Sequence, residues 1–288
     1  MNKKNNHIHI VECPRDAMQG WKHFIPTASK IEYLNALLQV GFNTLDFGSF
    51  VSAKAIPQMA DTKQVIEAID LAATNTKLLA IVANTRGAAD ACQYKAISYL
   101  GFPFSVSPTF QQRNTNSSID ASLERVKEIQ ELCVKHNKQL VVYLSMAFGN
   151  PYGDVYDASI VFEWANKMAA LGINIISLAD TVGVATPAQV KDVTQTIIEA
   201  LPGQEIGVHL HSTAQQFNKK LEAALAAGCR RFDGAMKGIG GCPMANDELV
   251  GNMNTEWMLD YFQQQSYATS TNKPALINAA AMATQIFI

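Results

Sequence analysis

Short apolar segments alternate with longer amphipathic segments along most of the chain, and this alternation constrains the fold more than any other feature. Eight segments have the apolar, β-branched character of strands that are buried on both faces: 8–12, 44–50, 77–84, 99–106, 139–146, 173–179, 205–211 and 230–235. Between them, apolar residues recur at three- and four-residue spacing, which predicts helices such as 28–40, 62–72, 117–136, 160–170, 187–201 and 213–227. This repeated order of strand and helix predicts an α/β fold with a parallel sheet covered by helices.

The number of units favours a closed (β/α)8 TIM barrel over an open sheet. An open doubly wound sheet would favour a glycine-rich phosphate loop after the first strand, whereas this turn reads Cys13-Pro14-Arg15-Asp16. We therefore expect a catalytic barrel over residues 7–262, followed in 263–288 by a polar connector and a short C-terminal apolar helix. That helix is expected to pack on the barrel or on a partner, for which a homodimer is one candidate.

Composition excludes several classes of protein. The 288 residues are 48% hydrophobic, which is enough for a large core, and the net charge of −2 gives no electrostatic reason to expect a nucleic-acid partner. No segment approaches the roughly 18 consecutive apolar residues of a membrane span, and the polar start lacks the apolar core of a signal peptide. The five cysteines form no C-x-x-C pair and are interpreted as thiols. We expect a cytoplasmic protein with no membrane partner.

Polar residues stand at or just beyond the C-terminal ends of the predicted strands, where TIM barrels carry their active sites. They are Arg15, Asp16, Asp46, Asn84, Ser105, Ser107, Ser145, Asp180, His209 and His211. Each of them alone is explained equally well as a helix cap or a turn-stabilising residue. Together they predict a shared site, because burying so many unneeded polar groups at one end of a barrel would cost free energy.

His209 and His211 form the most specific of these pairs. Side chains at i and i+2 of a strand point to the same face, so two imidazoles can converge on one metal ion. A hydrogen-bonded histidine pair is the alternative that the spacing leaves open. Cys242 adds a thiol in the glycine-rich segment 238–243.

Five segments resemble the 3-hydroxy-3-methylglutaryl-CoA (HMG-CoA) lyase family of metal-dependent TIM-barrel lyases and synthases. They read E-C-P-R-D-A-M-Q at 12–19, S-F-V-S-A-K-A-I-P-Q-M at 49–59, S-L-A-D-T-V-G-V-A-T-P at 177–187, H-L-H at 209–211 and G-I-G-G-C-P at 238–243. The resemblance covers roughly residues 7–262. It implies a divalent cation, an acyl-CoA substrate and cleavage of HMG-CoA to acetoacetate and acetyl-CoA.

The resemblance also assigns roles to single residues. The implied metal ligands are Asp16, His209, His211 and Asn252, and their oxygen and imidazole donors favour Mg²⁺ or Mn²⁺. The expected catalytic residues are Arg15, Asp46, Asp180, His209 and Cys242. Arg15, Gln19, Ser49 and Ser145 are expected to bind the substrate. In this interpretation Arg15 stabilises the enolate and Cys242 protonates it.

The sequence departs from the family pattern at three places. Asp46 stands where the family usually has a glutamate that supports the catalytic arginine, and its side chain is shorter by about 1.5 Å. We therefore expect its contact with Arg15 or the substrate hydroxyl to need a water or a shifted backbone. Ser212 replaces a common aspartate, and the cysteine loop is one residue longer. A related 3-hydroxyacyl-CoA is therefore an alternative substrate.

Three further functions compete with this one. Condensing synthases of the superfamily share the H-x-H site but usually carry long C-terminal extensions, and we expect no regulatory domain after this barrel. Aldolases acting on 4-hydroxy-2-oxo acids leave the Gly-Gly-Cys-Pro segment unexplained. A non-enzymatic barrel that only binds acyl-CoA or metal is supported by Asp46 and opposed by the retained Arg15, Asp16, both histidines and Cys242.

Overall fold

Eight parallel strands close into a barrel in the computed structural model, which describes residues 6–241 and 250–288. The strands are β1 (His9–Glu12), β2 (Thr44–Ser49), β3 (Lys77–Ile81), β4 (Ile97–Ser105), β5 (Gln139–Ser145), β6 (Ile175–Ala179), β7 (Glu205–His209) and β8 (Arg231–Gly234). Each strand pairs with the next one in the sequence, and β1 also pairs with β8, which closes the barrel. The predicted fold class and all eight predicted strands are confirmed.

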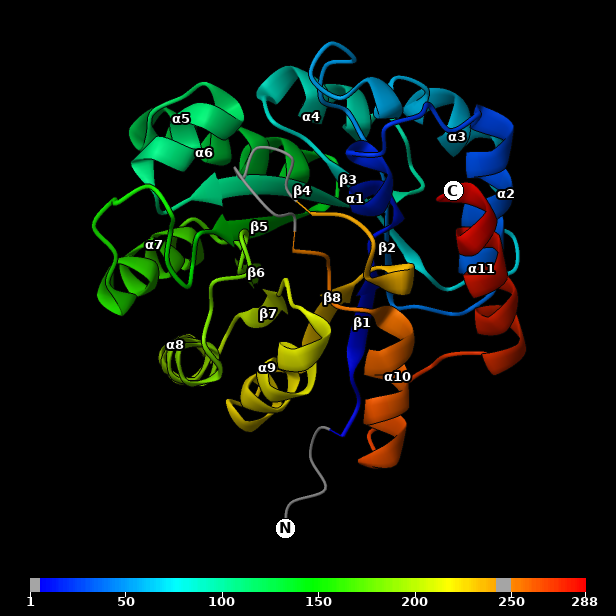
Figure 1. The fold of residues 1–288 in the computed structure, drawn as a ribbon. Coiled ribbons are helices and arrows are strands. Elements are labelled where there is room, and N and C mark those ends of the chain that lie inside the picture. Colours follow the sequence, from blue (N-terminus) through cyan, green and yellow to red (C-terminus); the bar gives the residue numbers. More distant parts are fainter. Residues whose placement is uncertain (1–5, 242–249) are drawn as a thin grey trace.

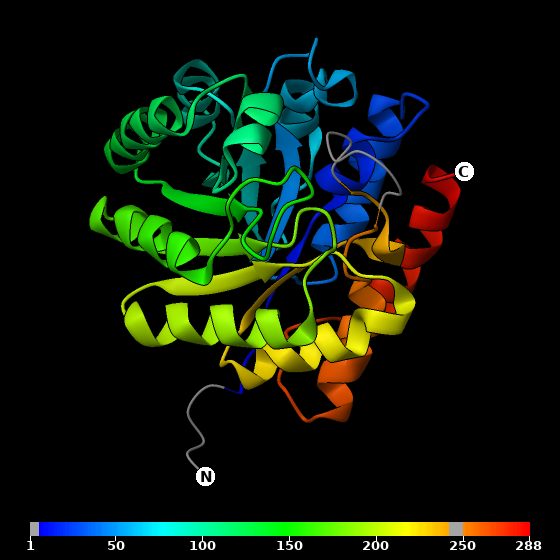
Figure 2. The ribbon, with the colours of Figure 1, turned by 60° about the vertical axis from the view of Figure 1, so that its left-hand side comes forward.

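Helices surround the strands (Figure 1), and a turned view shows how they wrap the barrel (Figure 2). They are α1 (Pro14–Gln19), α2 (Thr27–Leu38), α3 (Thr62–Ala68), α4 (Thr85–Cys92), α5 (Pro108–Thr115), α6 (Ile119–Lys135), α7 (Ala158–Ala170), α8 (Pro187–Ala200), α9 (Ala214–Ala226), α10 (Thr255–Gln264) and α11 (Lys273–Ile286), with 3-10 turns η1 (Pro57–Met59) and η2 (Met236–Gly238). The six predicted helices are present. Helices α1, α4, α5 and α10 were not predicted, because their short lengths of six to ten residues repeat the apolar spacing only a few times.

The last helix, α11, lies along α2 beside the barrel (Figure 1). Ala279 and Ala283 are its fully buried residues. The preceding segment is anchored to the start of the chain, where His7 pairs with Ala268. In the part of the chain that the structure describes, no helix is long and apolar enough to cross a membrane.

The barrel lumen is partly polar. Its apolar side chains are Leu79, Ile81, Val141, Tyr143 and Ile175, which form a cluster separate from the larger core between the strands and the helices. Charged residues are buried there too: Arg231 and Asp233 of β8 are 1% and 2% exposed. Gly207 pairs in register with Arg231, and a Cβ at this glycine would lie 2.9 Å from the Arg231 Cδ. The arginine side chain therefore occupies the space that Gly207 leaves in the lumen.

Candidate active site

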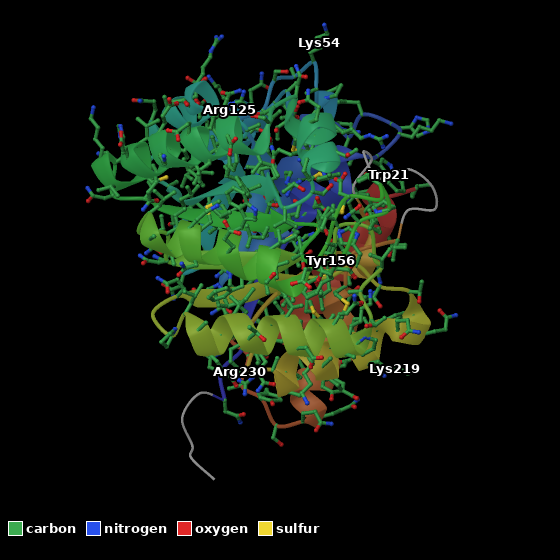
Figure 3. All side chains as sticks on the ribbon, turned by 90° about the vertical axis from the view of Figure 1, so that its left-hand side faces the viewer. Trp21, Lys54, Arg125, Tyr156, Lys219 and Arg230 are labelled. Atoms are coloured by element: carbon green, nitrogen blue, oxygen red, sulfur yellow. The ribbon has the colours of Figure 1, made fainter. Side chains whose placement is uncertain are left out.

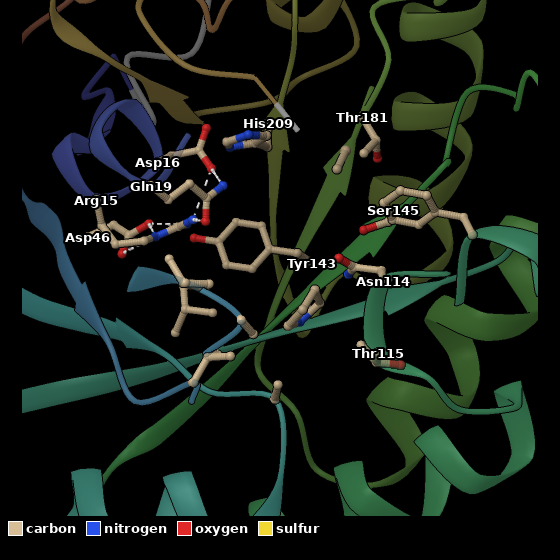
Figure 4. A pocket seen from close by; sticks show the side chains of 18 of the residues that line it. Arg15, Asp16, Gln19, Asp46, Asn114, Thr115, Tyr143, Ser145, Thr181 and His209 are labelled. Carbon is tan, nitrogen blue, oxygen red and sulfur yellow. Dashed lines mark hydrogen bonds and ion pairs between the residues drawn. The ribbon is translucent and has the colours of Figure 1, made fainter. Parts of the chain in front are cut away.

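A cavity of about 230 Å³ opens at the C-terminal ends of the strands. Its polar lining comes from Arg15, Asp16, Gln19, Asp46, Asn114, Thr115, Ser145, Thr181, His209 and His211 (Figure 4). Most of the strand-end residues that the sequence singled out for metal or substrate binding therefore meet in one place. Apolar side chains complete the wall, among them Val51, Ile56, Ile81, Pro103 and Phe110.

Helix α1 begins directly after β1 and carries three of the polar residues. Pro14 occupies its first turn, where a proline costs no hydrogen bond and its fixed φ suits the helix. Arg15 and Gln19 are four residues apart, so they lie on one face, and Arg15 Nη1 donates to Gln19 Oε1 at 2.8 Å. Gln19 Nε2 in turn donates to Asp16 Oδ1 at 2.8 Å. The first βα connection is therefore a rigid helical turn.

Arg15 and Asp46 form a direct ion pair. Arg15 Nε lies 3.0 and 3.2 Å from the two Asp46 carboxylate oxygens, and Nη2 donates to the same carboxylate. Of the two expected alternatives, a water or a shifted backbone, the contact does not need the water, because the Asp46 carboxylate reaches the guanidinium directly. Strand β2 is irregular at this point: its register with β3 shifts between Asp46 and Gly48. Burial raises the pKa of Asp46 to about 6, against the opposing effect of Arg15.

The guanidinium of Arg15 retains one donor for a ligand. Of its five N–H groups, Nη1 uses two on Asp16 Oδ1 and Gln19 Oε1, and Nε and Nη2 each use one on Asp46. One Nη2 hydrogen therefore has no partner among the described residues. A fixed positive charge with a spare donor at the cavity wall is suited to stabilising a developing oxyanion.

The two histidines meet through their Nε2 atoms, which lie 3.3 Å apart. The other ring nitrogen of each has a partner: His209 Nδ1 lies 3.2 Å from Asp233 Oδ2, and His211 Nδ1 lies 2.8 Å from the Val250 carbonyl oxygen. Because both Nδ1 partners are acceptors, each ring donates from Nδ1 and directs an Nε2 lone pair toward the other ring. This arrangement suits two imidazoles that share a cation. A mutual hydrogen bond would require one of them to carry a proton on Nε2.

Asp16 and Asn252 complete the cluster. Ligand atoms of Asp16, His209 and His211 all lie within 4.8 Å of one another. Asn252 Nδ2 donates to Asp16 Oδ2 at 2.7 Å and to the Ile239 carbonyl at 2.9 Å. Its Oδ1 is buried without a hydrogen-bond partner in the described part of the chain. Buried polar atoms are nearly always satisfied, so this oxygen fits a fourth cation ligand.

The local environment favours the deprotonated forms of Asp16 and His211 and the protonated form of His209. Burial lowers the pKa of His211, and the neighbouring His209 lowers it further. Burial also acts to lower the pKa of His209, but the hydrogen bond and charge of Asp233 outweigh it and raise this pKa. For Asp16, burial is outweighed by Arg15, which holds its pKa below the usual range.

Among the described residues predicted for catalysis or substrate binding, two do not line the cavity. Ser49 is buried in β2, where its hydroxyl donates to the Ile81 carbonyl and accepts from the Val51 N–H. The Asp180 carboxylate is turned into the protein and paired with Lys220 at 2.6 Å. Both side chains thus serve internal hydrogen bonds and do not line the cavity, and the expected roles of Ser49 in substrate binding and of Asp180 in catalysis stay predictions. Cys242 lies outside the described residues.

Sequence reasoning missed Asp233 and Tyr143. Asp233 is the last residue but one of β8, and the rule that singled out the other strand ends would have found it. Tyr143 extends from β5 toward the Arg15–Asp46 pair (Figure 4), and its ring lies edge-on to His209 at 5.9 Å. Its buried hydroxyl has no partner within the described ranges. No local signal marks Tyr143, because an aromatic residue in a buried strand is ordinary core material.

Known proteins resemble this chain along almost its whole length. The HMGL-like family model matches residues 8–283. The mitochondrial hydroxymethylglutaryl-CoA lyase of Bos taurus is 33% identical over 96% of this chain and 85% of its own length, and the hydroxymethylglutaryl-CoA lyase YngG of Bacillus subtilis is 33% identical over 93% and 88%. An HMG-CoA lyase from Acinetobacter baumannii, solved in complex with coenzyme A and 3-methylmalate, superimposes with a TM-score of 0.92 at 30% identity, covering 100% of this chain and 93% of that one.

Proposed function

The chain belongs to the HMGL-like family, and from this premise we propose that it is a metal-dependent carbon–carbon lyase that cleaves HMG-CoA into acetoacetate and acetyl-CoA. One observation carries the proposal: ligand atoms of Asp16, His209 and His211 lie within 4.8 Å of one another beside Arg15, which keeps a donor for a ligand. Asn252, which donates to Asp16, adds a buried oxygen without a partner among the described residues. The names of the relatives support the same activity.

A divalent cation is the cofactor that suits this cluster. Asp16, His209, His211 and Asn252 would hold it, and the mixture of oxygen and imidazole donors without thiolates favours Mg²⁺ or Mn²⁺ over a structural zinc ion. When bound, the cation acts as a Lewis acid on substrate oxygens. Asp233 contributes by fixing the tautomer and orientation of His209 through the 3.2 Å contact.

Arg15 is placed to serve the bond-breaking step. Once the C3 hydroxyl has lost its proton, the C2–C3 bond breaks, its electron pair passes to the departing thioester, and acetoacetate is released. The resulting acetyl-CoA enolate carries its negative charge mainly on oxygen. The spare Nη2 donor of Arg15 can bind that oxygen, while Asp46 and Gln19 keep the guanidinium in place. A proton must then return to C2, and Cys242 remains the donor that the sequence suggests.

The acyl-CoA class of substrate is supported by the bound molecules of the Acinetobacter baumannii structure, a coenzyme A and a branched hydroxy acid. The cavity of this chain offers a matching wall, with apolar Ile81 and Phe110 and the polar Ser145. Asp46 favours one alternative: because this carboxylate is shorter than the usual glutamate, a 3-hydroxyacyl-CoA with a different 3-substituent is the second candidate substrate.

Acetyl-CoA release from a panel of 3-hydroxyacyl-CoA thioesters tests the proposal. The purified chain should cleave HMG-CoA after addition of Mg²⁺ or Mn²⁺ and should lose this activity on chelation. If the chain cleaves another thioester of the panel faster than HMG-CoA, that thioester is the better candidate for the substrate. Absence of cleavage of every thioester by the metal-loaded chain would leave a binding protein and reject the lyase function.

A further inference from the structure

Lys220 of α9 is a buried cation close to the candidate metal site, although no sequence motif includes it. Its side chain is 2% exposed. Nζ lies 2.6 Å from Asp180 Oδ2, 2.8 Å from the His211 carbonyl oxygen and 3.1 Å from the Gly183 carbonyl oxygen. An ammonium group has three N–H donors, so these three acceptors use all of them. Lys220 thus joins α9 to the loop after β6 and to the segment that carries a proposed metal ligand.

The same loop also supports the imidazole ring of His211. Gly183 has a φ of +73°, and a Cβ at this position would lie 2.9 Å from the Val250 side chain, so the loop backbone packs directly on Val250. The Val250 carbonyl accepts the hydrogen bond from His211 Nδ1 at 2.8 Å. Lys220 therefore contacts the His211 backbone directly, and it holds the loop that packs against the acceptor of the ring.

We propose that Lys220 is a positioning residue for His211 and thereby sets the affinity of the site for divalent cations. This inference rests on the metal-dependent function proposed above. It differs from the simpler interpretation that Lys220 only neutralises Asp180. A buried ion pair that serves neutralisation alone can be exchanged for a neutral pair without consequence elsewhere. A positioning residue cannot be exchanged in this way, because replacing Lys220 also removes the hydrogen-bond donor of the His211 and Gly183 carbonyls.

The sign of the effect separates positioning from simple electrostatics. Removing the positive charge of Lys220 would strengthen the binding of a nearby cation if charge alone mattered. If Lys220 orients His211, its removal should weaken cation binding, since the imidazole is no longer held toward the shared point. Residues that orient metal ligands typically change metal affinity by roughly 10- to 100-fold when they are mutated.

The experiment compares the Mn²⁺ dissociation constants of two purified variants by electron paramagnetic resonance without substrate. Lys220→Met alone would leave Asp180 buried without a partner and endanger folding. The comparison is therefore between Asp180→Asn and the double variant Asp180→Asn/Lys220→Met, which differ only in Lys220. We expect the double variant to bind Mn²⁺ roughly 10- to 100-fold more weakly. Lys219→Met is the matched control, since Lys219 projects from the outer surface of the same helix (Figure 3).

The outcomes are distinct. Equal or tighter Mn²⁺ binding by the double variant would overturn the role of Lys220 and leave the proposed lyase function intact. An equal loss in Lys219→Met would also overturn it, because the effect would then follow net charge. A parent chain that binds no Mn²⁺ would reject the metal-dependent function and this role together.

Discussion

Both ends of the barrel bury an arginine beside carboxylates, and the two arginines are placed differently. At the C-terminal end of the strands, Arg15 lines the cavity, is 8% exposed and keeps one N–H for a ligand. At the N-terminal end, Arg231 is 1% exposed and lies 3.5 Å from Glu205 and 2.8 Å from His9 Nε2. Its Nε and Nη2 have no hydrogen-bond partner among the residues described.

The difference shows that residue type alone does not mark an active site. Both clusters contain an arginine, a carboxylate and a histidine. Among the described residues, ligand atoms suited to a metal ion converge at the C-terminal cluster. The N-terminal cluster lines a separate cavity, where Glu205 lies 3.1 Å from His9 Nδ1, and it has no such convergence within the same described ranges. This agrees with the division in TIM barrels between a catalytic C-terminal face and a stabilising N-terminal face. Substitutions at the two ends should therefore affect different properties.

The largest contrast is expected between the two arginines. Arg15→Gln should lower kcat by roughly 10²- to 10³-fold, because it removes the charge proposed to stabilise the enolate. Arg231→Gln is the matched control and should change kcat by less than about threefold while lowering the melting temperature, as expected for a residue at the stabilising face. Steady-state kinetics with thermal melts distinguish the two, and a comparable loss of kcat in both variants would contradict the comparison.

Substitutions of Asp46 test whether the partner of Arg15 at the catalytic end also contributes to turnover. Asp46→Ala should lower kcat/KM by roughly 10- to 150-fold, which corresponds to about 1.5–3 kcal/mol for one charge-assisted hydrogen bond. Asp46→Glu tests the departure from the family. Faster cleavage of HMG-CoA by this variant would indicate that the natural substrate is another acyl-CoA. Parental kinetics in Asp46→Ala would remove Asp46 from the mechanism.

Asp233 lies between the two ends, two residues after Arg231 on β8 and in contact with His209. Asp233→Asn should weaken Mn²⁺ binding by roughly 10- to 100-fold, because the amide supports the His209 tautomer less well than the carboxylate. Calorimetric titration with Mn²⁺ measures this change. If the affinity is unaltered, Asp233 belongs with the stabilising cluster at the N-terminal end.

The smallest effect on activity is expected at Glu205. Burial acts to raise its pKa, but the hydrogen bond from His9 and the charge of Arg231 outweigh burial and lower the pKa from 4.5 to about 2. A lowered carboxyl pKa contributes stability above pH 4.5 that is lost as the pH falls toward 2. Glu205→Gln should therefore reduce the free energy of unfolding at neutral pH and leave kcat/KM within about twofold.

Denaturant titrations across pH check this prediction. The difference in unfolding free energy between parent and Glu205→Gln should be constant above about pH 5 and should narrow as the pH falls from 4.5 toward 2. A difference that is independent of pH would show that the ion pair contributes nothing through its charge. A large loss of activity would move the N-terminal cluster into the catalytic machinery.

The sequence by itself determined the barrel and most of the candidate metal ligands. The strand and helix periods are local properties, so eight repeats could be recognised without knowing any contact between them. The spacing of His209 and His211 is equally local, because alternation along a strand brings i and i+2 to one face. Arg15 and Asp16 follow the first strand directly, which places them at the same end of the barrel.

Only the tertiary structure decided which partner each of these groups meets. Closure of the barrel brings Asp233 to His209 from 24 residues away, and Lys220 meets Asp180 across 40 residues. The direction of a side chain at a strand end was equally undetermined: Asp180 and Ser49 occupy predicted positions but turn into internal hydrogen bonds. The physical reason is that charge pairing and hydrogen bonding depend on the distance between atoms, and barrel closure sets that distance for residues far apart in the chain.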